Sequence, residues 1–116
     1  MTARLLGAMG EQMAARYLRD NGYHIKAANY RTRIGEIDII ASKGKYICFI
    51  EVKTRRRGGY LMPKDAVDEC KERKIIGSAE VYMAYKNSKL LPRFDIIEVL
   101  LNGNDLYKIN HIKGAF

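Results

Sequence analysis

Apolar residues near the start of the chain recur every three or four positions, which is the period of a helix. The apolar positions on this face are Leu6, Met9, Met13 and Tyr17. The pattern predicts an amphipathic helix from Leu5 to Asp20, and the Asn-Gly pair that follows supplies a stop signal.

Five shorter segments rich in β-branched and aromatic residues predict β-strands. They are 23–30, 34–41, 46–53, 94–101 and 106–112. Polar turn residues at 42–45 join the second segment to the third, and Asn102-Gly103 joins the last two. Each of these two pairs is therefore expected to form an antiparallel hairpin.

A second helix is predicted after a polar segment. Residues 54–61 carry three arginines and two glycines and predict a mobile loop. Pro63 suits a first helical position, and acids such as Asp68 suit the opening turns, so this helix is expected to run from Pro63 to about Lys86. A helical crossover lets the strands on either side of it run parallel, which predicts a mixed sheet flanked by helices.

Composition favours one domain over residues 1–116. The chain has 116 residues, of which 47% are hydrophobic, so it can bury roughly two-thirds of its unfolded surface without disulfides or a structural metal. Lys and Arg total 21 against 13 Asp and Glu, a net charge of +8. This excess favours a polyanionic partner such as nucleic acid, although it also fits a basic protein kept soluble by its charge.

The cysteines and the apolar runs indicate a reducing setting away from membranes. Cys48 and Cys70 lack the spacing of a metal site and stand among apolar neighbours, so both are expected to be reduced core residues. No apolar run approaches the roughly 18 residues of a membrane span, and the N-terminus lacks the hydrophobic region of a signal peptide. The sequence therefore predicts a cytoplasmic protein with no membrane partner.

Two acids interrupt the apolar strands of the first predicted hairpin, where ionised groups are costly. A turn near residue 44 places Asp38 opposite the 49–51 region, so its carboxylate and that of Glu51 are expected at the same end of the hairpin. Lys53 shares a strand face with Glu51, about 6.7 Å away along the chain. The alternative is that both acids face solvent and that Lys53 pairs with one of them.

Glu11 adds a third acid, from the first predicted helix. It shares a face with Ala14, Ala15 and Leu18, so it is expected to point toward the protein, unless its carboxylate is solvated at the border of the helix. Close carboxylates repel each other unless a cation lies between them. Oxygen ligands of this kind suit Mg²⁺ or Mn²⁺.

Taken in order, these acids and several short motifs resemble those of the YraN-like family, a bacterial family of small uncharacterised proteins with a restriction-endonuclease-like fold. The resemblance covers nearly the whole chain. Its motifs are Gly10-Glu11 with Ala14 and Ala15, Gly22-Tyr23, Asn29-Tyr30-Arg31, Gly35-Glu36-Ile37-Asp38, Phe49-Ile50-Glu51-Val52-Lys53-Thr54-Arg55, Ala66-Val67, Lys71 and Arg93-Phe94-Asp95.

The resemblance implies an α/β domain with a mixed central sheet of about five strands flanked by helices. The wider superfamily cuts phosphodiester bonds with Mg²⁺, using an Asp followed by Asp or Glu, any residue and Lys, and its Holliday-junction resolvases add a Glu on the first helix. Glu11, Asp38 and Glu51 would then be metal ligands, and Lys53 would orient or deprotonate the attacking water. Ile37 stands where many superfamily members carry Pro, a position that shapes the backbone and supplies no ligand.

Basic residues frame the two acidic strands and would contact phosphates on either side of a cleavage point. The residues expected to bind nucleic acid are Arg31, Arg33, Arg55, Arg56, Arg57 and Lys71. The alternative is a flexible, solvated run of charge. Tyr60, beside this run, is expected to pack within its loop or to stack on a base.

The remaining polar residues are expected to have other roles. Asp95 is interpreted as a structural partner of Arg93, and Glu36 is expected to lie at the margin of the acidic site. His24 and His111 are isolated in the sequence, so neither is predicted to be a metal ligand or a general base.

These features predict a Mg²⁺- or Mn²⁺-dependent endonuclease that hydrolyses phosphodiester bonds in DNA. The alternative is a non-catalytic DNA-binding or scaffold protein that keeps the nuclease fold. A homodimer would suit symmetric cutting of two strands, because its two-fold axis places two sites on a duplex.

Overall fold

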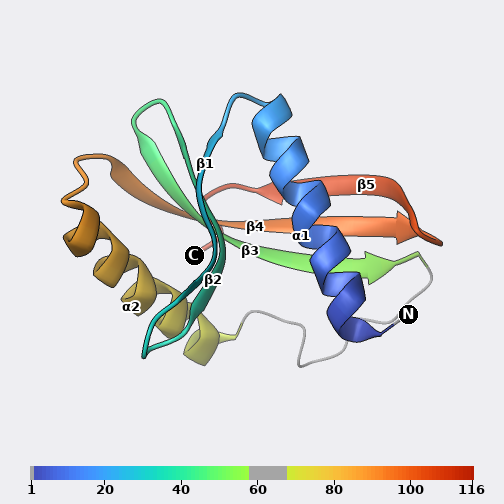
Figure 1. Cartoon of the computed structure of the whole chain (residues 1–116), viewed down its shortest axis with the longest axis horizontal. Helices are drawn as coiled ribbons and strands as arrows, with labels where there is room; N and C mark the ends of the chain where they lie inside the picture. Colours follow the sequence, from blue (N-terminus) through green and yellow to red (C-terminus); the bar gives the residue numbers. More distant parts are fainter. Residues whose placement is uncertain (1, 58–67) are drawn as a thin grey trace.

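The computed structural model describes residues 2–57 and 68–116. The order of helices and strands predicted from the sequence is confirmed (Figure 1). The elements are α1 (Ala3–Asp20), β1 (His24–Arg31), β2 (Glu36–Lys43), β3 (Tyr46–Arg56), α2 (Glu69–Lys86), β4 (Leu91–Asn102) and β5 (Asp105–Ile112).

The strands form one mixed sheet in the order β1-β2-β3-β4-β5. The pairs β1–β2, β2–β3 and β4–β5 are antiparallel, and β3 and β4 are parallel. This confirms the predicted mixed sheet. Between the two parallel strands the chain passes through α2, which carries it back to the end of the sheet where β3 began, so that β4 can run in the same direction as β3.

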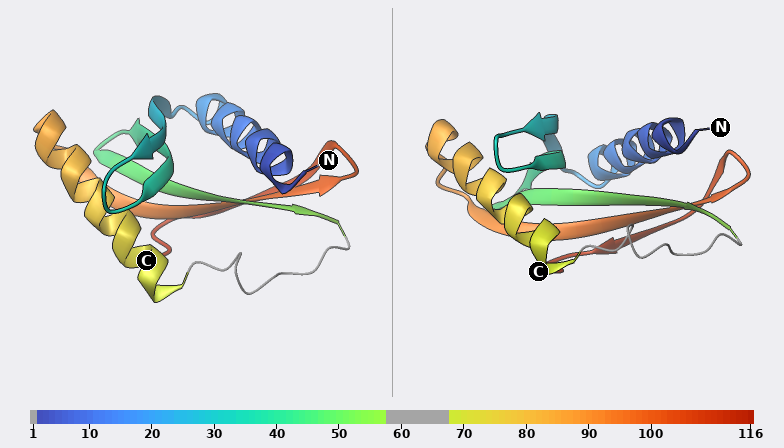
Figure 2. Two further views of the ribbon diagram at one scale, coloured as in Figure 1. Left: turned by 60° about the horizontal axis from the view of Figure 1, so that its bottom comes forward. Right: turned by 90° about the horizontal axis from the view of Figure 1, so that it is seen from below.

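The two helices cover different parts of the sheet. Figure 1 shows α1 crossing the long strands β3, β4 and β5, while α2 lies at the other end, beside the β1–β2 hairpin. The views in Figure 2 show the same separation from below, with the ends of the two helices far apart. The hairpin of β2 and β3 carries Asp38 and Glu51, and we call it the acidic hairpin. It therefore lies between the helices, where side chains from both can reach it.

The apolar core is divided accordingly. The buried cluster beneath α1 consists of Ala14, Leu18, Tyr23, Ile39, Ala41, Cys48, Ile50, Ile97, Val99 and Leu101. The buried cluster beneath α2 consists of Ile37, Ile40, Ile47, Phe49, Ile75, Ala79 and Tyr82. Ile37 and Ile39 would share a face in a regular strand but belong to different clusters, so the regular alternation of faces along β2 is interrupted near Asp38.

Helix α1 lies close to β3 because one of its contact positions has no side chain. A Cβ built on Gly10 would lie 1.7 Å from Thr54 Oγ1 and 2.8 Å from Thr54 Cβ. Such distances are sterically forbidden, so only glycine allows this approach. The contact brings the next residue, Glu11, close to the acidic hairpin.

We expect Gly10→Ala to lower the free energy of unfolding by about 1–3 kcal/mol, because the added methyl forces α1 away from β3. Gly7→Ala is the matched control: nothing lies within 4 Å of its added Cβ, and alanine favours a helix by about 1 kcal/mol over glycine. Urea unfolding of the two variants measures both changes. Equal stabilisation by both substitutions would contradict the close packing.

The beginning of α2 differs from the prediction. The predicted start at Pro63 lies outside the described residues, and Asp68, predicted to lie within the helix, is its N-cap with an extended backbone (φ −85°, ψ 174°). The Asp68 carboxylate accepts a hydrogen bond from the backbone N–H of Lys71 at 2.8 Å. Aspartate is among the preferred residues for this capping position.

The predicted loop over residues 54–61 is partly wrong. Strand β3 continues to Arg56 and pairs in parallel register with β4 up to Leu101. The parallel ladder satisfies the backbone of these polar residues, which outweighs their weak strand propensity. Residues 58–61, including Tyr60, lie outside the described residues.

The cysteine prediction is half correct. Both cysteines are free, and Cys48 is buried in the core. Cys70 is exposed and was wrongly predicted to be a core residue, because it lies in the first turn of α2 on the side of a surface cavity. In the part of the chain that the structure describes, no helix is long and apolar enough to cross a membrane.

Candidate functional site

The two strands of the acidic hairpin separate at Asp38, and we call this unpaired end of the hairpin the acidic fork. The β2–β3 ladder runs from Lys43–Tyr46 to Ile39–Ile50, where the paired register ends. Beyond it, Asp38 Oδ2 accepts a hydrogen bond from the backbone N–H of Val52 at 2.9 Å. The side chain thus replaces the missing strand partner of a half-buried N–H group, which fixes the carboxylate between the two strands.

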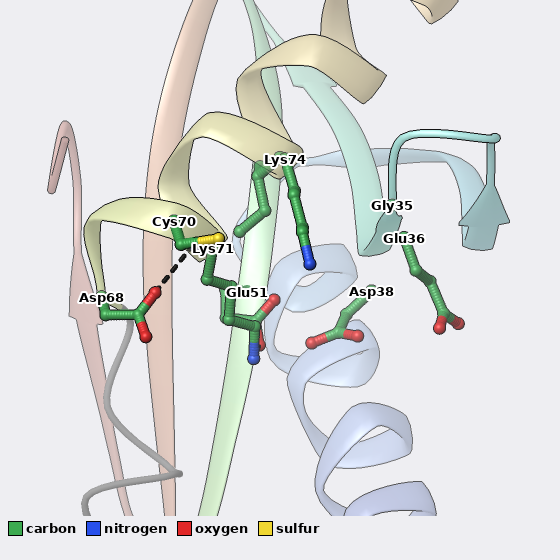
Figure 3. Close-up of a pocket in the computed structure, with 9 residues that line it drawn as sticks. Gly35, Glu36, Asp38, Glu51, Asp68, Cys70, Lys71 and Lys74 are labelled. Carbon is green, nitrogen blue, oxygen red and sulfur yellow. Dashed lines mark hydrogen bonds and ion pairs between the residues drawn. The ribbon is translucent and has the colours of Figure 1, made fainter.

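Glu51 lies on the β3 side of this fork and is 5% exposed. Its Oε1 is 2.5 Å from Lys71 Nζ and 3.8 Å from Lys53 Nζ. Figure 3 shows Lys71 descending from α2 beside Glu51, with the Asp38 carboxylate pointing toward this pair. Lys53 and Lys71 therefore converge on one nearly buried acid.

Glu11 reaches the same fork from α1. It is half-buried, whereas Ala14 and Leu18 on its helix are fully buried, so the predicted inward face is confirmed. Burial raises the pKa of the Glu11 carboxyl, a hydrogen bond with Asp38 opposes the shift, and the negative charge of Glu51 adds to it. The structure thus brings the three predicted acids together from α1, β2 and β3.

Crowding of these acids is strongest at Asp38. Burial and the negative charge of Glu51 raise the pKa of Asp38 to about 8, although the hydrogen bond from the Val52 N–H and the positive charge of Lys71 act in the opposite direction. A carboxyl group in this environment gains from any additional cation placed between it and its acidic neighbours.

Asp38 separates two surface cavities. One, of about 380 Å³, lies toward α2 and is lined by Gly35, Glu36, Asp38, Glu51, Asp68, Cys70, Lys71, Lys74 and Ile75. The other, of about 440 Å³, lies toward α1 and is lined by Ala3, Arg4, Gly7, Ala8, Glu11, Asn29, Arg31, Asp38 and Val52. Figure 3 shows Glu36 at the edge of the first cavity, turned away from Glu51.

The predicted basic residues lie on several elements of the structure. Arg31 and Arg33 are exposed at the end of β1 and just beyond it. Arg55 forms an ion pair with Glu98 on β4 at 2.8 Å, and Arg56 Nη2 donates to Asn104 at 3.4 Å. These two guanidinium groups therefore contact β4 and the turn that follows it.

Three residues that line the cavities were missed in the sequence. Arg4 lies seven positions before Glu11 and Lys74 three positions after Lys71, so helical spacing could have placed each on the face of its neighbour. Asn29 could not have been found in this way, because it lies on β1 and its left-handed backbone (φ +51°) is not revealed by the sequence.

The donor set is of the kind that holds a hard divalent cation. Carboxylate oxygens are the preferred ligands of Mg²⁺, and the mutual repulsion around Asp38 is the condition that such an ion relieves. Among residues 2–57 and 68–116, however, no three His, Cys, Asp or Glu side chains already stand in metal-binding geometry. The Lys71 ammonium forms an ion pair with the Glu51 carboxylate, so a metal ion would compete with Lys71 for that carboxylate.

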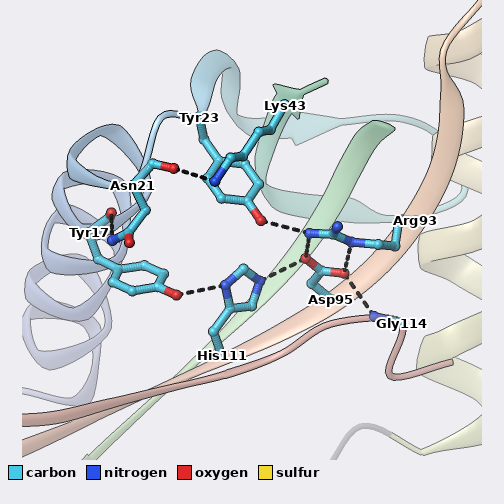
Figure 4. Close-up of polar contacts among 8 residues, drawn as sticks. All are labelled: Tyr17, Asn21, Tyr23, Lys43, Arg93, Asp95, His111 and Gly114. Atoms are coloured by element: carbon cyan, nitrogen blue, oxygen red, sulfur yellow. Dashed lines mark hydrogen bonds and ion pairs between the residues drawn. The ribbon is translucent and has the colours of Figure 1, made fainter. Parts of the chain in front are cut away.

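A second polar cluster lies on the α1 side of the sheet at Asp95, which is fully buried. Arg93 donates to both carboxylate oxygens at 2.9 and 2.8 Å, His111 Nε2 lies 2.7 Å from Oδ2, and the Gly114 N–H donates to Oδ1 at 3.0 Å (Figure 4). The Tyr17 hydroxyl contacts His111 Nδ1 at 2.9 Å. The geometry agrees with the structural role predicted for Asp95, and it gives His111 an internal partner.

The fold and these clusters define an α/β protein with an acidic fork at the edge of two cavities. The profile of the uncharacterised protein family UPF0102 matches residues 10–99. A UPF0102 protein of Caldanaerobacter subterraneus subsp. tengcongensis is 47% identical over 97% of this chain and 95% of its own length. A UPF0102 protein of Caldicellulosiruptor bescii is 43% identical over the full length of both chains.

A third relative, a UPF0102 protein of Clostridium botulinum, is 45% identical over 96% of this chain and 93% of its own. The chain belongs to the UPF0102 family, which confirms the predicted YraN-like membership. The names of these relatives specify no activity.

Proposed function

We propose that this protein is a Mg²⁺-dependent endonuclease that hydrolyses phosphodiester bonds in DNA. The observation that carries the proposal is the meeting of Glu11, Asp38 and Glu51 at a fork in the sheet, beside two lysines. Acids brought together at a cost in repulsion are typical of functional sites.

In this proposal, Glu11, Asp38 and Glu51 would hold the metal ion. The bound Mg²⁺ would supply a Lewis acid for the phosphoryl oxygen and lower the pKa of an attacking water. Lys53, which lies beside Glu51, would donate to the scissile phosphate or hold the water in line. Mn²⁺ would serve in place of Mg²⁺, because it accepts the same oxygen ligands.

The nucleic acid would lie across Asp38 from one cavity to the other. Arg4 and Arg31 line the cavity on the α1 side, and Lys71 and Lys74 line the one on the α2 side. Cations on both sides of the acids would hold the phosphates that flank the cleavage point. Net charge of +8 would assist the approach of DNA. The proposed setting is the cytoplasm, and a homodimer would present two such sites to a duplex.

The ion pair between Lys71 and Glu51 favours a second candidate. An ammonium 2.5 Å from Glu51 neutralises that acid without a metal. A non-catalytic DNA-binding protein with this fold would keep the basic cavity linings and lose the hydrolytic centre. Its binding to DNA would be sensitive to salt and would survive Asp38→Ala, because phosphate contacts release counterions without any metal.

Cleavage assays on labelled linear, flapped and branched DNA with Mg²⁺ or Mn²⁺ distinguish the two. We expect the wild type to cut at least one of these, and Lys53→Ala to reduce the rate by at least about 100-fold. Lys45→Ala, at the exposed hairpin turn remote from the fork, is the matched control and should cut normally. Salt-sensitive binding without cleavage by the wild type would favour the non-catalytic candidate.

A further inference from the structure

Asn29 has an unusual backbone conformation and lies on β1, opposite Asp38 on the neighbouring strand β2. The residues on either side of Asn29 pair with those on either side of Asp38 in the β1–β2 ladder, so these two residues face each other. Asn29 has a φ of +51°, which is a left-handed conformation that a residue within a strand rarely adopts. The left-handed residue therefore lies opposite the point where the alternation of faces along β2 is interrupted.

The end of a helix explains the positive φ of Asn87, but no such feature explains the positive φ of Asn29. Among residues 2–57 and 68–116, the other non-glycine residue with positive φ is Asn87, which ends α2 as its C-cap, a usual place for this conformation. Asn29 lies inside β1, where no helix ends. Glycine would adopt the conformation without steric cost, so the asparagine at this position indicates a use for the side chain.

The side chain of Asn29 connects two carboxylates of the fork. Its amide is oriented with the nitrogen toward them, because only this orientation matches donors with acceptors. Nδ2 then donates to Glu11 Oε1 at 3.1 Å and to Glu36 Oε1 at 3.3 Å. Donors to a carboxylate favour its charged form and fix its direction, which opposes the burial and like charge that act on Glu11.

We propose that Asn29 is a positioning residue whose left-handed backbone aims its amide between Glu11 and Glu36 and so holds Glu11 beside Asp38 for binding the metal. This inference rests on the proposed function, because it assigns Asn29 to the same metal site. Groups that orient a metal ligand without touching the metal change its affinity by about 10- to 100-fold.

Two substitutions separate the amide from the backbone. Asn29→Gly keeps the left-handed conformation and removes the amide, whereas Asn29→Ala removes the amide and strains the backbone. In calorimetric titrations with Mn²⁺, we expect both variants to bind about tenfold more weakly than the wild type. Only Asn29→Ala should also unfold at lower temperature, by about 5 °C. Asn87→Gly is the matched control and should leave the affinity for Mn²⁺ unchanged.

Wild-type affinity in Asn29→Gly, together with a loss in Asn29→Ala, would show that only the backbone matters and would overturn this inference while leaving the proposed function intact. A wild type that takes up no Mn²⁺ would overturn both. The two failures are therefore distinguished by the wild-type titration.

Discussion

Replacing Asp95 by Asn is expected to lower the free energy of unfolding by about 3–5 kcal/mol, because it leaves the positive charge of Arg93 in the interior without its counter-ion. Asparagine keeps one acceptor oxygen but cannot accept from Arg93, His111 and the Gly114 N–H at once. Urea unfolding at neutral pH measures the loss.

Glu98→Gln on the same strand is the matched control. Glu98 also pairs with an arginine at 2.8 Å, but both side chains are about a quarter exposed, so water screens the pair. The substitution should cost less than about 1 kcal/mol. Similar losses in the two variants would show that burial does not set the importance of the Asp95 cluster.

The Asp95 cluster also predicts a dependence on pH. Burial alone would raise the pKa of Asp95, but hydrogen bonds from His111, Arg93 and the Gly114 N–H outweigh it and lower the pKa to about 2. A lowered pKa stabilises the folded state above the ordinary value of 3.8, and this contribution of roughly 2 kcal/mol is lost as the pH falls from 3.8 through 2. Unfolding of Asp95→Asn should lack that component.

The second large effect is expected at Asp38. If the proposed function holds, Asp38→Asn should reduce metal-dependent cleavage of DNA by at least about 1,000-fold, because it removes a carboxylate oxygen that the proposed metal ion would bind. The same variant should unfold less readily than the wild type at pH 8 without metal, by about 1 kcal/mol or more, because it removes a crowded carboxylate. Asparagine can still accept from the Val52 N–H, so the fork should remain folded.

The sign of this stability change follows from the raised pKa of Asp38. Its rise from 3.8 to about 8 means that the folded state holds this proton more tightly than the unfolded chain. The contribution of Asp38 to the free energy of unfolding is therefore most favourable below pH 3.8, and it is lost as the pH rises to 8. Asp20→Asn, at the exposed end of α1, is the control and should change neither cleavage nor stability. A destabilised, active Asp38→Asn would contradict the repulsion at the fork.

Patterns of apolar and turn residues were sufficient to predict the order of the elements and the two hairpins. The hairpin of β2 and β3 was predicted because two segments rich in β-branched and aromatic residues flank a short polar turn, and the structure pairs them from Lys43–Tyr46 to Ile39–Ile50. The parallel pairing of β3 and β4 followed from the predicted helix between them. The start of α2 was not predictable in the same way, because Asp68 suits both a cap and a first turn.

Local sequence patterns predicted the acids of the site but not the contacts between elements that are distant in the chain. The position of the hairpin turn predicted that Asp38 lies near Glu51, and helical spacing predicted that Glu11 points inward. The contact of Lys71 with Glu51 depends on where α2 crosses the hairpin, which no local pattern determines. Likewise, the ion pair of Arg55 with Glu98, 43 residues away in the chain, depends on the parallel pairing of β3 and β4 rather than on any local pattern.

Calorimetric titration of the folded wild type with Mn²⁺, beside Asp38→Asn and Glu51→Gln, tests most directly whether the acidic fork is a metal site. We predict saturable binding by the wild type and none at millimolar Mn²⁺ by either variant, with circular dichroism showing that both stay folded. Absence of binding by the wild type, with and without DNA, or equal binding by all three proteins, would contradict the assignment.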